Sequence, residues 1–414
     1  MDIVELEGKT LQQLYTIAKD LKLPNPKQLK KHDLIFRILE VQTEKSGYMF
    51  AKGILEILPE GYGFLRTGGY LPSRDDVYVS QTQIRRFDMQ NGDLVTGQIR
   101  PPKDGEKHYS LLKIEAISGT DPEQARERVP FENLTPIFPE KRYTLEYPKC
   151  AVSARLIDLL SPIGMGQRAM IVSSPKAGKT TILKNIANSI SENFPDTVIK
   201  VLLVDERPEE VTDMQRCVKG EVIASTFDEP PENHIRIAEL LLEHCKRLVE
   251  GGKDVIILLD SITRLARAYN LVTPPSGRTL SGGLDPTCLH RPKRFFGAAR
   301  NIEEGGSLTI VATALVDTGS RMDDIIYEEF KGTGNLELHL NRKLANKRIF
   351  PAVDVKLSGT RREELLLEEK ELKKVWLLRK IMDSYDEAEA TEQLIERMKD
   401  FKTNKAFLDS SDVK

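Results

Sequence analysis

Four largely apolar runs, separated by longer segments, constrain the fold of this chain more than any other feature. Runs of this length are typical of strands buried on both faces of a parallel sheet. Helical periodicity follows the first run, over residues 182–190, and precedes the third, over 235–249. The alternation predicts a mostly parallel, doubly wound α/β sheet whose functional residues lie at the carboxyl ends of its strands. The runs are AMIV (169–172), VIKVLLV (198–204), VIILL (255–259) and LTIVATAL (308–315).

The rest of the sequence indicates further domains, because 414 residues exceed the usual size of one domain. Residues 1–47 repeat apolar side chains near the helical period, which predicts a small N-terminal helical module. Residues 48–118 carry short β-like runs between Gly, Pro and Asp turns, which predicts a small β-barrel. Residues 119–150 hold five prolines and no sustained period, so we interpret them as a linker to an α/β domain at 151–414.

The composition excludes some classes of protein and leaves others open. A formal charge of −2 neither requires nor excludes a nucleic-acid partner. The first residues are acidic where a secretory signal would be basic, and no apolar run reaches the roughly 20 residues that span a bilayer. We therefore expect a cytoplasmic protein without a membrane partner. The scattered cysteines favour reduced, buried thiols over disulfides or a zinc site; they are Cys150, Cys217, Cys245 and Cys288.

The segment SSPKAGKTT (173–181) follows the first apolar run and opens a helical segment. A helix N-terminus offers free backbone N–H groups and a favourable dipole to a polyphosphate, so this position predicts an ATP site. Gly178 allows close approach of the backbone, Lys179 brings a charge to the β and γ phosphates, and the Thr180 hydroxyl can ligate Mg2+. The strict motif has glycine where this chain has Ser173, and an ordinary strand-to-helix turn is the alternative interpretation.

Two carboxylates directly follow other apolar runs. Asp260 ends the run in DVIILLDS, the position of the carboxylate that holds magnesium in such ATPases, although an Asp here could instead cap a helix. Glu206, in VLLVDERPEE, is our candidate for the base that activates the attacking water, and a surface charge run is the alternative. With Lys179, these residues predict ATP hydrolysis that uses Mg2+.

A second candidate site lies in the segment GYGFLR (61–66). Tyr62 and Phe64 are two residues apart and share one face of a strand, and Arg66 continues that face. Two aromatic rings and a cation in line form a platform on which the bases of single-stranded RNA can stack. The alternative is that both rings face the core of the barrel. Nearby basic residues either line a groove or are scattered surface charges; they are Arg85, Arg86, Arg100, Lys103 and Lys107.

Several longer segments of the chain form a distinctive set: PKAGKT, DERPEEVT, DSITRLARAYN, HRPKRFFGAARN, EEFKGTGN, SGTRREELL and EILPEGYGFLR. Through them, and over essentially its whole length, the sequence resembles the Rho family of bacterial transcription termination factors. The resemblance implies a homohexameric ring of RecA-like P-loop ATPase domains, each preceded by a helical module and an OB-fold that binds cytosine-rich RNA. It further implies an RNA helicase that moves along nascent RNA and releases the transcript, with RNA polymerase and elongation factors as partners.

The same resemblance assigns roles at the ATP site. It implies that Arg207 gates the site, that Arg361 acts as an arginine finger on the ATP of the neighbouring subunit, and that Phe350 stacks on adenine. The remaining nucleotide contacts fall to Lys176, Ala177 and Thr181. Thr181 stands where the family often has methionine.

The resemblance also assigns RNA contacts outside the aromatic pair. Two loops match those that line the central pore of the ring, SGRTLSGG (276–283) with Arg278 and TGSRMD (318–323) with Arg321. Both arginines replace a lysine that is common in the family. In the barrel, the implied contacts include Tyr78, Lys107 and His108, and His108 stands where the family often has an aromatic residue.

Two other interpretations stay open from the sequence. The segment SPIGMGQR (161–168) also resembles rotary and secretion-type ATPases, although the Tyr62 and Phe64 pair argues against that class. A binding module without catalysis is the other alternative, against which Lys179, Glu206 and Asp260 argue together.

Overall fold

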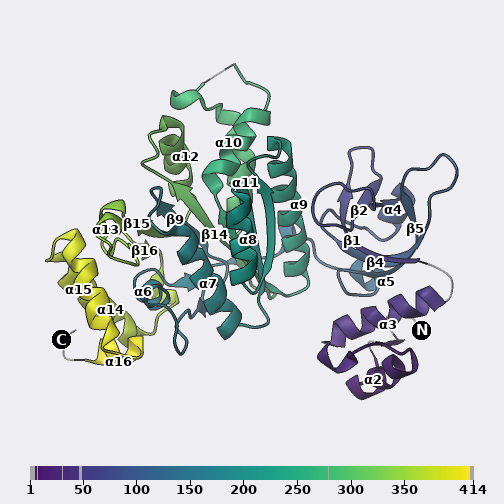
Figure 1. Ribbon diagram of the computed structural model, residues 1–414, viewed down its shortest axis with the longest axis horizontal. Coiled ribbons are helices and arrows are strands. Elements are labelled where there is room, and N and C mark those ends of the chain that lie inside the picture. Colours follow the sequence, from purple (N-terminus) through teal and green to yellow (C-terminus); the bar gives the residue numbers. More distant parts are fainter. Residues whose placement is uncertain (1–4, 7, 30, 46–48, 278, 411–414) are drawn as a thin grey trace. The chain divides into compact units, whose positions relative to one another are not determined.

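The computed structural model describes residues 5–6, 8–29, 31–45, 49–277 and 279–410, and among them the chain forms two compact units (Figure 1). One unit comprises residues 1–133 together with 239–251, and the other comprises 134–238 together with 252–414. Each unit has hydrophobic clusters of its own. The domain boundaries at 47, 118 and 150 stay predictions.

Two helices near the N-terminus pack against each other, as their apolar periodicity predicts. They are α2 (Leu11–Asp20) and α3 (Lys31–Lys45), joined through the short 3-10 helix η1 (Pro26–Gln28). Thr10 begins α2 with a capping box, which satisfies backbone N–H groups that the first turn leaves free. The helices bury the side chains of Leu14, Ala18, Leu34, Ile35, Ile38 and Leu39.

The predicted small barrel is confirmed as a closed five-stranded barrel in the order β1-β2-β3-β5-β4. Leu55, Leu65 and Val95 belong to its buried core, and alternate residues along the strands point away from that core. A short helix, α4 (Gln81–Arg86), follows β3. The strands are β1 (Met49–Ile57), β2 (Gly63–Arg66), β3 (Val77–Val79), β4 (Leu94–Arg100) and β5 (Tyr109–Ile117).

The segment that we interpreted as a linker contains short regular elements. In the first unit these are α5 (Pro122–Ala125) and η2 (Phe131–Asn133). In the second unit, β6 (Pro136–Ile137) pairs with β13 (Arg300–Ile302), and β7 (Arg142–Tyr143) pairs with β8 (Ile163–Gly164). A strand of two residues is too short to produce periodicity, so the sequence pattern did not reveal these pairings.

The second unit is built on the predicted α/β sheet, which is confirmed. Its main strands follow the order β11-β10-β12-β14-β9-β15-β16, and every pair in that series is parallel except β15 with β16. The four apolar runs form β9 (Arg168–Ser173), β10 (Val198–Glu206), β12 (Asp254–Asp260) and β14 (Ser307–Leu315). Three further strands were not predicted from the sequence: β11 (Glu221–Thr226), β15 (Leu336–Leu340) and β16 (Gly359–Thr360).

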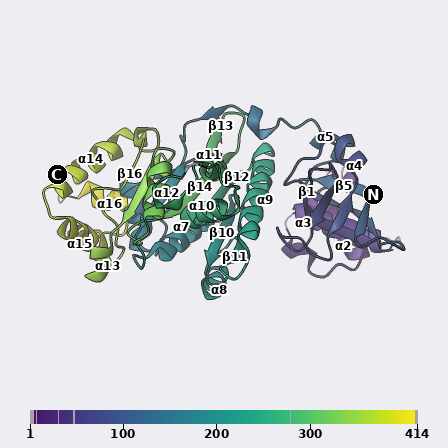
Figure 2. The same cartoon turned by 90° about the horizontal axis from the view of Figure 1, so that it is seen from above.

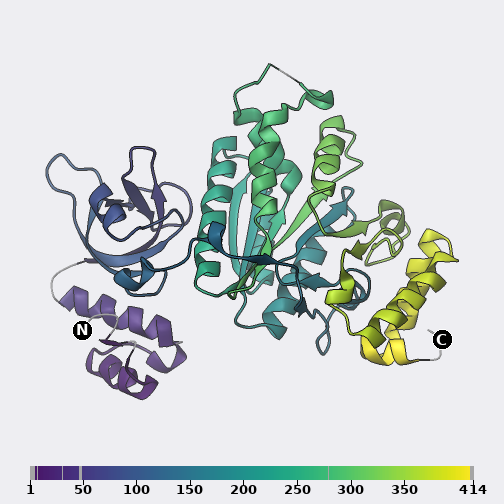
Figure 3. The same cartoon turned by 180° about the vertical axis from the view of Figure 1, so that it is seen from behind.

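Helices connect and cover these strands. The principal ones are α6 (Val152–Leu160), α7 (Lys179–Asn193), α8 (Pro208–Cys217), α9 (Pro231–Glu250), α10 (Ile262–Val272), α11 (His290–Gly297), α12 (Arg321–Lys331) and α13 (Arg342–Asn346). Figures 1 and 3 show α10 and α12 beside each other, and both helices contact the inner strand β14. Figure 2 shows three C-terminal helices gathered at one end of the unit: α14 (Glu369–Asp383), α15 (Glu387–Lys399) and α16 (Asn404–Asp409).

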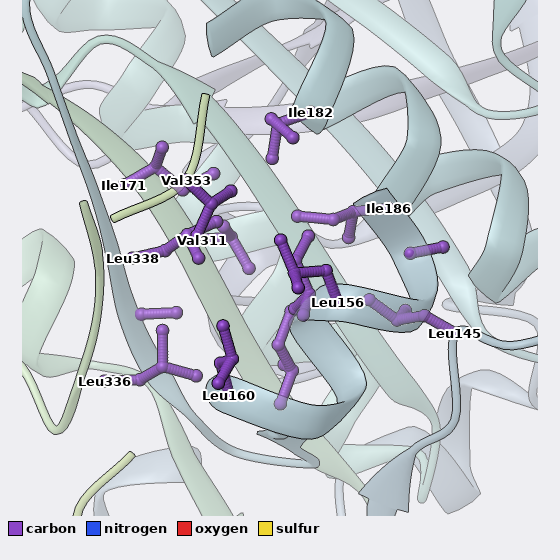
Figure 4. Close-up of a cluster of buried hydrophobic side chains, with 14 of the residues drawn as sticks. Leu145, Leu156, Leu160, Ile171, Ile182, Ile186, Val311, Leu336, Leu338 and Val353 are labelled. Atoms are coloured by element: carbon purple, nitrogen blue, oxygen red, sulfur yellow. The ribbon is translucent and has the colours of Figure 1, made fainter. Parts of the chain in front are cut away.

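One large hydrophobic cluster holds the phosphate-loop strand in place. Figure 4 shows Ile171 of β9 and Val311 of β14 among side chains from α6, α7 and β15. Ile182 and Ile186 of α7 are both buried in this cluster, so the helix that follows the loop is fixed on the sheet. Tight packing of this kind lets a short loop keep a defined geometry.

The structure tests the prediction that the four cysteines are buried, reduced thiols. Cys245 and Cys288 are buried free thiols as predicted, whereas Cys217 is exposed and Cys150 is half-buried. Cys217 is the last residue of the amphipathic helix α8. The identity of a single cysteine does not show whether it lies on the exposed or the buried face of such a helix. Within the described residues, no helix combines the length and the apolar character needed to cross a membrane.

Candidate functional site

The loop between β9 and α7 turns shortly before the first residue of the helix. Ser173 ends β9 in extended conformation, fully buried, and its Oγ donates a hydrogen bond to the carbonyl oxygen of Ser174 at 2.9 Å. The positive φ values fall later, at Lys176 (66°) and Gly178 (97°), immediately before the first helical residue. The site of the missing glycine therefore needs no glycine, because the chain turns three residues further on.

Lys179 lies between the two predicted carboxylates. Its Nζ donates to Glu206 Oε1 at 2.9 Å and to both carboxylate oxygens of Asp260 at 2.7 Å. The side chain of Lys179 is 18% exposed, while those of Glu206 and Asp260 are 4% and 1% exposed. Because β10 and β12 are parallel neighbours, their carboxyl ends bring these residues together. The structure thus brings together the three residues that the sequence analysis selected from separate segments.

Burial raises the pKa of Glu206 above its ordinary value, and the neighbouring Asp260 charge adds to this increase. Burial alone would lower the pKa of Lys179, but Asp260 and Glu206 hold it above its ordinary value. The lysine is therefore charged and compensates for two carboxylates of like charge at close range. A carboxylate with a raised pKa is better suited to accept a proton near neutral pH.

Two further residues contact the carboxylates and were missed by the sequence analysis. Thr313 of β14 donates through Oγ1 to Asp260 Oδ1 at 2.7 Å. Arg264 of α10 donates through Nη1 to Asp205 Oδ2 at 2.7 Å, and its Nε lies 3.4 Å from Glu206 Oε1. The sequence could have indicated Arg264, because this residue stands four positions after Asp260, in the first turn of the helix that follows the strand.

The other residues predicted to contact the nucleotide differ in how far they are exposed to solvent. Thr180 is half-buried in the first turn of α7, Ala177 is buried, and Lys176 and Thr181 are exposed. Arg207 is exposed at the start of α8, directly after Glu206. Phe350 is 52% exposed, which leaves its ring available for a stacking partner.

Arg361 lies at the opposite end of the sheet from the phosphate loop of its own chain. Its backbone N–H donates to the carbonyl oxygen of Asn335 at 2.9 Å, and the N–H of Asn335 donates to the carbonyl oxygen of Arg168 at 2.9 Å. Arg168 begins β9, whereas the loop follows Ser173 at the other end of that strand. Five residues at about 3.3 Å each separate the two ends by about 16 Å.

In the barrel, four ring systems form one cluster, which we call the aromatic cluster: Tyr62, Phe64, Tyr78 and His108. The ring centroids of Tyr62 and Phe64 are 5.9 Å apart, and Tyr78 lies 5.6 Å and 6.0 Å from them. His108 lies 5.0 Å from Phe64. Leu65, the residue after Phe64, belongs to the buried core, whereas Tyr62 and Phe64 are half-buried outside it.

Arg66 does not extend this cluster as an exposed cation. Its Nε donates to Glu56 Oε2 at 2.7 Å and its Nη1 to Asp76 Oδ2 at 2.5 Å, with only 4% of the side chain exposed. The guanidinium carbon still lies 5.3 Å from the centroid of Phe64. The strand periodicity predicted that Arg66 lies on the same face as the rings. In the structure it is buried, because it forms ion pairs with the carboxylates of Glu56 and Asp76.

A pocket of about 520 Å³ lies beside the aromatic cluster and is lined by Tyr78, Arg100, Lys107 and His108 among other residues. Lys107 is exposed, whereas Arg100 pairs with Glu106 through hydrogen bonds of 2.6 Å and 2.9 Å. Two members of the predicted basic cluster, Arg100 and Lys107, therefore line a concave surface, and the carboxylate of Glu106 already compensates the charge of Arg100.

The two loops predicted to contact RNA in the pore, residues 276–283 and 318–323, touch each other. A side chain at Gly282 would meet the backbone of Arg321 and Met322 within about 3 Å, so the two segments touch here. Arg321 begins α12 and is exposed. Asp323, behind it, is fully buried and accepts hydrogen bonds from Arg267 and Thr318. Arg278 lies outside the described residues.

Comparisons with known families divide the chain into three matched regions. Residues 5–47 match the family "Rho termination factor, N-terminal domain", and residues 51–123 match "Rho termination factor, RNA-binding domain". Residues 153–360 match "ATP synthase alpha/beta family, nucleotide-binding domain".

Full-length relatives are similar throughout. The transcription termination factor Rho of Bacillus subtilis (strain 168) is 58% identical over 410 residues, which cover 99% of this chain and 96% of the relative. The protein of the same name from Escherichia coli (strain K12) is 56% identical over 414 residues, covering 99% of each chain. The solved structure of the ATPase EscN of an enteropathogenic E. coli type III secretion system has a TM-score of 0.54 and 24% identity, over 67% of this chain and 68% of that chain. This likeness concerns the fold alone.

Proposed function

The chain belongs to the transcription termination factor Rho family, and on that premise we propose how its residues divide the work of ending transcription. It is an RNA-binding ATPase that acts as an RNA helicase or translocase. The observation that carries the residue assignment is the convergence of Lys179, Glu206 and Asp260 beside the phosphate loop.

At this loop, Gly178 and Lys179 bind the phosphates of ATP. Lys179 then exchanges its two carboxylate partners for phosphate oxygens, which frees Glu206 to accept a proton from the attacking water. Arg264 keeps the carboxylate of Glu206 oriented during this exchange, since it contacts both Asp205 and Glu206.

The donor set around Asp260 fits Mg2+, because a buried carboxylate and the Thr180 hydroxyl are hard oxygen ligands and phosphates complete such sites. When bound there, Mg2+ would neutralise charge on the phosphates. Arg207 closes the entrance to the site and Phe350 stacks on adenine, and both side chains are exposed as these roles require. The remaining nucleotide contacts fall to Lys176, Ala177 and Thr181.

Arg361 supplies its charge to a nucleotide on a neighbouring copy. It starts about 16 Å from its own loop, the length of β9 from Arg168 to Ser173, and an extended arginine side chain spans less than half of that distance. A neighbouring subunit can present the residue instead, which is a known way to stabilise charge in phosphoryl transfer. This requirement supports an oligomeric ring, which we propose to be a homohexamer.

Mixed rings test this assignment. Subunits that carry Arg361→Ala should be inactive alone, and so should subunits that carry Glu206→Gln. Rings assembled from both should recover part of the ATPase activity, because an intact loop then faces an intact arginine. Activity that stays absent at every mixing ratio would show that Arg361 acts on the nucleotide of its own chain.

The aromatic cluster binds the bases of cytosine-rich nascent RNA, with Lys107 and His108 at its edge and Arg66 supporting it from the buried side. The loops with Arg278 and Arg321 contact the RNA backbone in the pore of the ring. The chain acts in the cytoplasm, where nascent RNA is made, and RNA polymerase and elongation factors are its partners.

Replacing Tyr62 and Phe64 together with Ala should weaken binding of a short cytosine-rich RNA by at least tenfold. Each stacked base contributes about 1 to 3 kcal/mol, and a tenfold change needs about 1.4 kcal/mol. Fluorescence anisotropy with a labelled oligonucleotide measures the change, and the melting temperature of the variant controls for loss of the barrel. Unchanged affinity in a folded variant would assign both rings to packing.

A further inference from the structure

We propose that Arg168 is a second cation on the face that carries Arg361, and that the two arginines together bind the terminal phosphates of a nucleotide held by a neighbouring copy. The inference rests on the proposed ring and extends it by one residue. It starts from a cavity at the amino end of β9, at the far end of the sheet from the phosphate loop.

The cavity has a volume of about 180 Å³ and is lined by Arg168, Arg361 and Arg362, together with Gln167, Asn335 and Phe138. A water molecule in liquid occupies about 30 Å³, so the cavity can admit a phosphate-sized anion with some of its hydration. All of these residues belong to the same compact unit.

The backbone fixes both arginines to one residue, Asn335. Its Oδ1 accepts hydrogen bonds from the backbone N–H of Arg168 at 2.9 Å and from Gln167 Nε2 at 2.7 Å. Its backbone carbonyl oxygen accepts from the N–H of Arg361 at 2.9 Å. The start of β9 and the residue after β16 are therefore held together, and the side chains of Arg168 and Arg361 both line the cavity.

Among the described residues, neither guanidinium lies within ion-pair distance of a carboxylate, although the charge of Arg361 helps to lower the pKa of Glu337. Arg168 donates through Nε to the carbonyl oxygen of Thr333 at 3.0 Å and through Nη1 to that of Ala299 at 3.1 Å, both neutral acceptors. Burial lowers the pKa of Arg168, and the charges of Arg300 and Arg361 lower it further. A guanidinium that lies close to other positive charges is stabilised when an anion binds beside it. Phosphate suits this role, because arginine can donate two parallel hydrogen bonds to its oxygens.

Arg362 shows the contrast within the same cavity. Its Nε donates to Glu364 Oε1 at 2.6 Å, and its guanidinium carbon lies 5.0 Å from the ring centroid of Phe138. Its charge is compensated and its position is fixed by these contacts. Arg362 therefore serves as a matched control at the edge of the cavity.

The experiment uses full-length subunits and mixed rings. Arg168→Met alone should lower RNA-stimulated ATP turnover by about 10- to 100-fold, the usual effect of one lost hydrogen bond to a charged group. Arg168→Lys, which keeps the charge, should retain more activity than Arg168→Met, and Arg362→Met should leave turnover within about twofold. Mixing Arg168→Met subunits with Glu206→Gln subunits should recover activity, because the intact loop of the first then meets the intact Arg168 of the second.

A parallel mixture of Arg361→Ala with Glu206→Gln separates the inference from the proposed ring. If that mixture recovers and the Arg168→Met mixture does not, the ring stands and Arg168 acts only within its own chain. If neither recovers, the trans arrangement itself is wrong. A loss of RNA affinity by Arg168→Met, with normal turnover at saturating RNA, would assign the cavity to RNA backbone and contradict the proposal. Oligomer mass and melting temperature of each variant confirm that the rings are assembled and folded.

Discussion

Replacing Glu206 with Gln should reduce ATP turnover by about 10²- to 10⁴-fold, the usual contribution of a general base, while ATP binding stays close to that of the parent protein. Gln keeps the size of the side chain and can still accept a hydrogen bond from Lys179, but it cannot take a proton from water. Single-turnover hydrolysis measures the loss, and equilibrium binding of a labelled nucleotide checks that the site is intact.

The same substitution carries a second expectation that concerns stability. Burial and the Asp260 charge raise the pKa of Glu206, so its ionised form is less favourable in the folded protein than in the unfolded chain. Neutral Gln removes that cost, and the variant should be at least as stable as the parent at neutral pH. Glu209→Gln, an exposed acid two residues into α8, is the matched control and should leave turnover unchanged. Substantial turnover by Glu206→Gln would remove Glu206 from the role of base.

Replacing Lys179 with Met should both prevent ATP turnover and destabilise the nucleotide-free protein. The substitution removes the cation that compensates for two nearly buried carboxylates. Breaking a buried ion pair costs about 3 to 5 kcal/mol, and the partial exposure of Lys179 places this case toward the lower end. Denaturant unfolding without nucleotide measures the stability change separately from activity.

The pH dependence of this variant has a defined sign. A carboxylate whose pKa is raised in the folded state binds its proton more readily there, so stability decreases as pH rises from the ordinary value of 4.5 through the raised value. Without Lys179 the pKa of Glu206 should rise further. Lys179→Met should therefore lose more stability than the parent as the pH approaches neutrality.

Two further variants sharpen the test. The double variant Lys179→Met, Glu206→Gln should recover part of the lost stability, because one of the two like charges is gone. Lys184→Met is the matched single control, since Lys184 lies on the same helix but pairs with the exposed Asp213. Exposed pairs contribute at most about 1 kcal/mol. Equal destabilisation by both lysine substitutions would contradict the charge argument.

Several parts of this structure followed from the sequence because their signals are local. Strands β9, β10, β12 and β14 are buried on both faces, so each appears in the sequence as a largely apolar run. The meeting of Glu206 with Asp260 also followed, since parallel strands end at one edge of the sheet.

Other parts depend on contacts between distant segments. Arg66 shares a strand face with Phe64, but its burial is decided by Glu56 and Asp76, which pairing of β1, β2 and β3 brings close. Thr313 and Arg168 likewise gain their partners only through the sheet. Strand β15, which lies between β9 and β16, alternates buried and half-buried residues over LELHL, a period-two pattern that was present in the sequence and was missed.

RNA-dependent ATP hydrolysis, recorded together with the mass of the assembled oligomer, tests the central claim most directly. We predict little turnover without RNA and a sharp increase with cytosine-rich RNA, in a ring whose mass corresponds to six copies. The increase should disappear in Glu206→Gln and require more RNA when Tyr62 and Phe64 are Ala. Equal turnover with and without RNA would contradict the account of an ATPase that is driven by the RNA on which it moves.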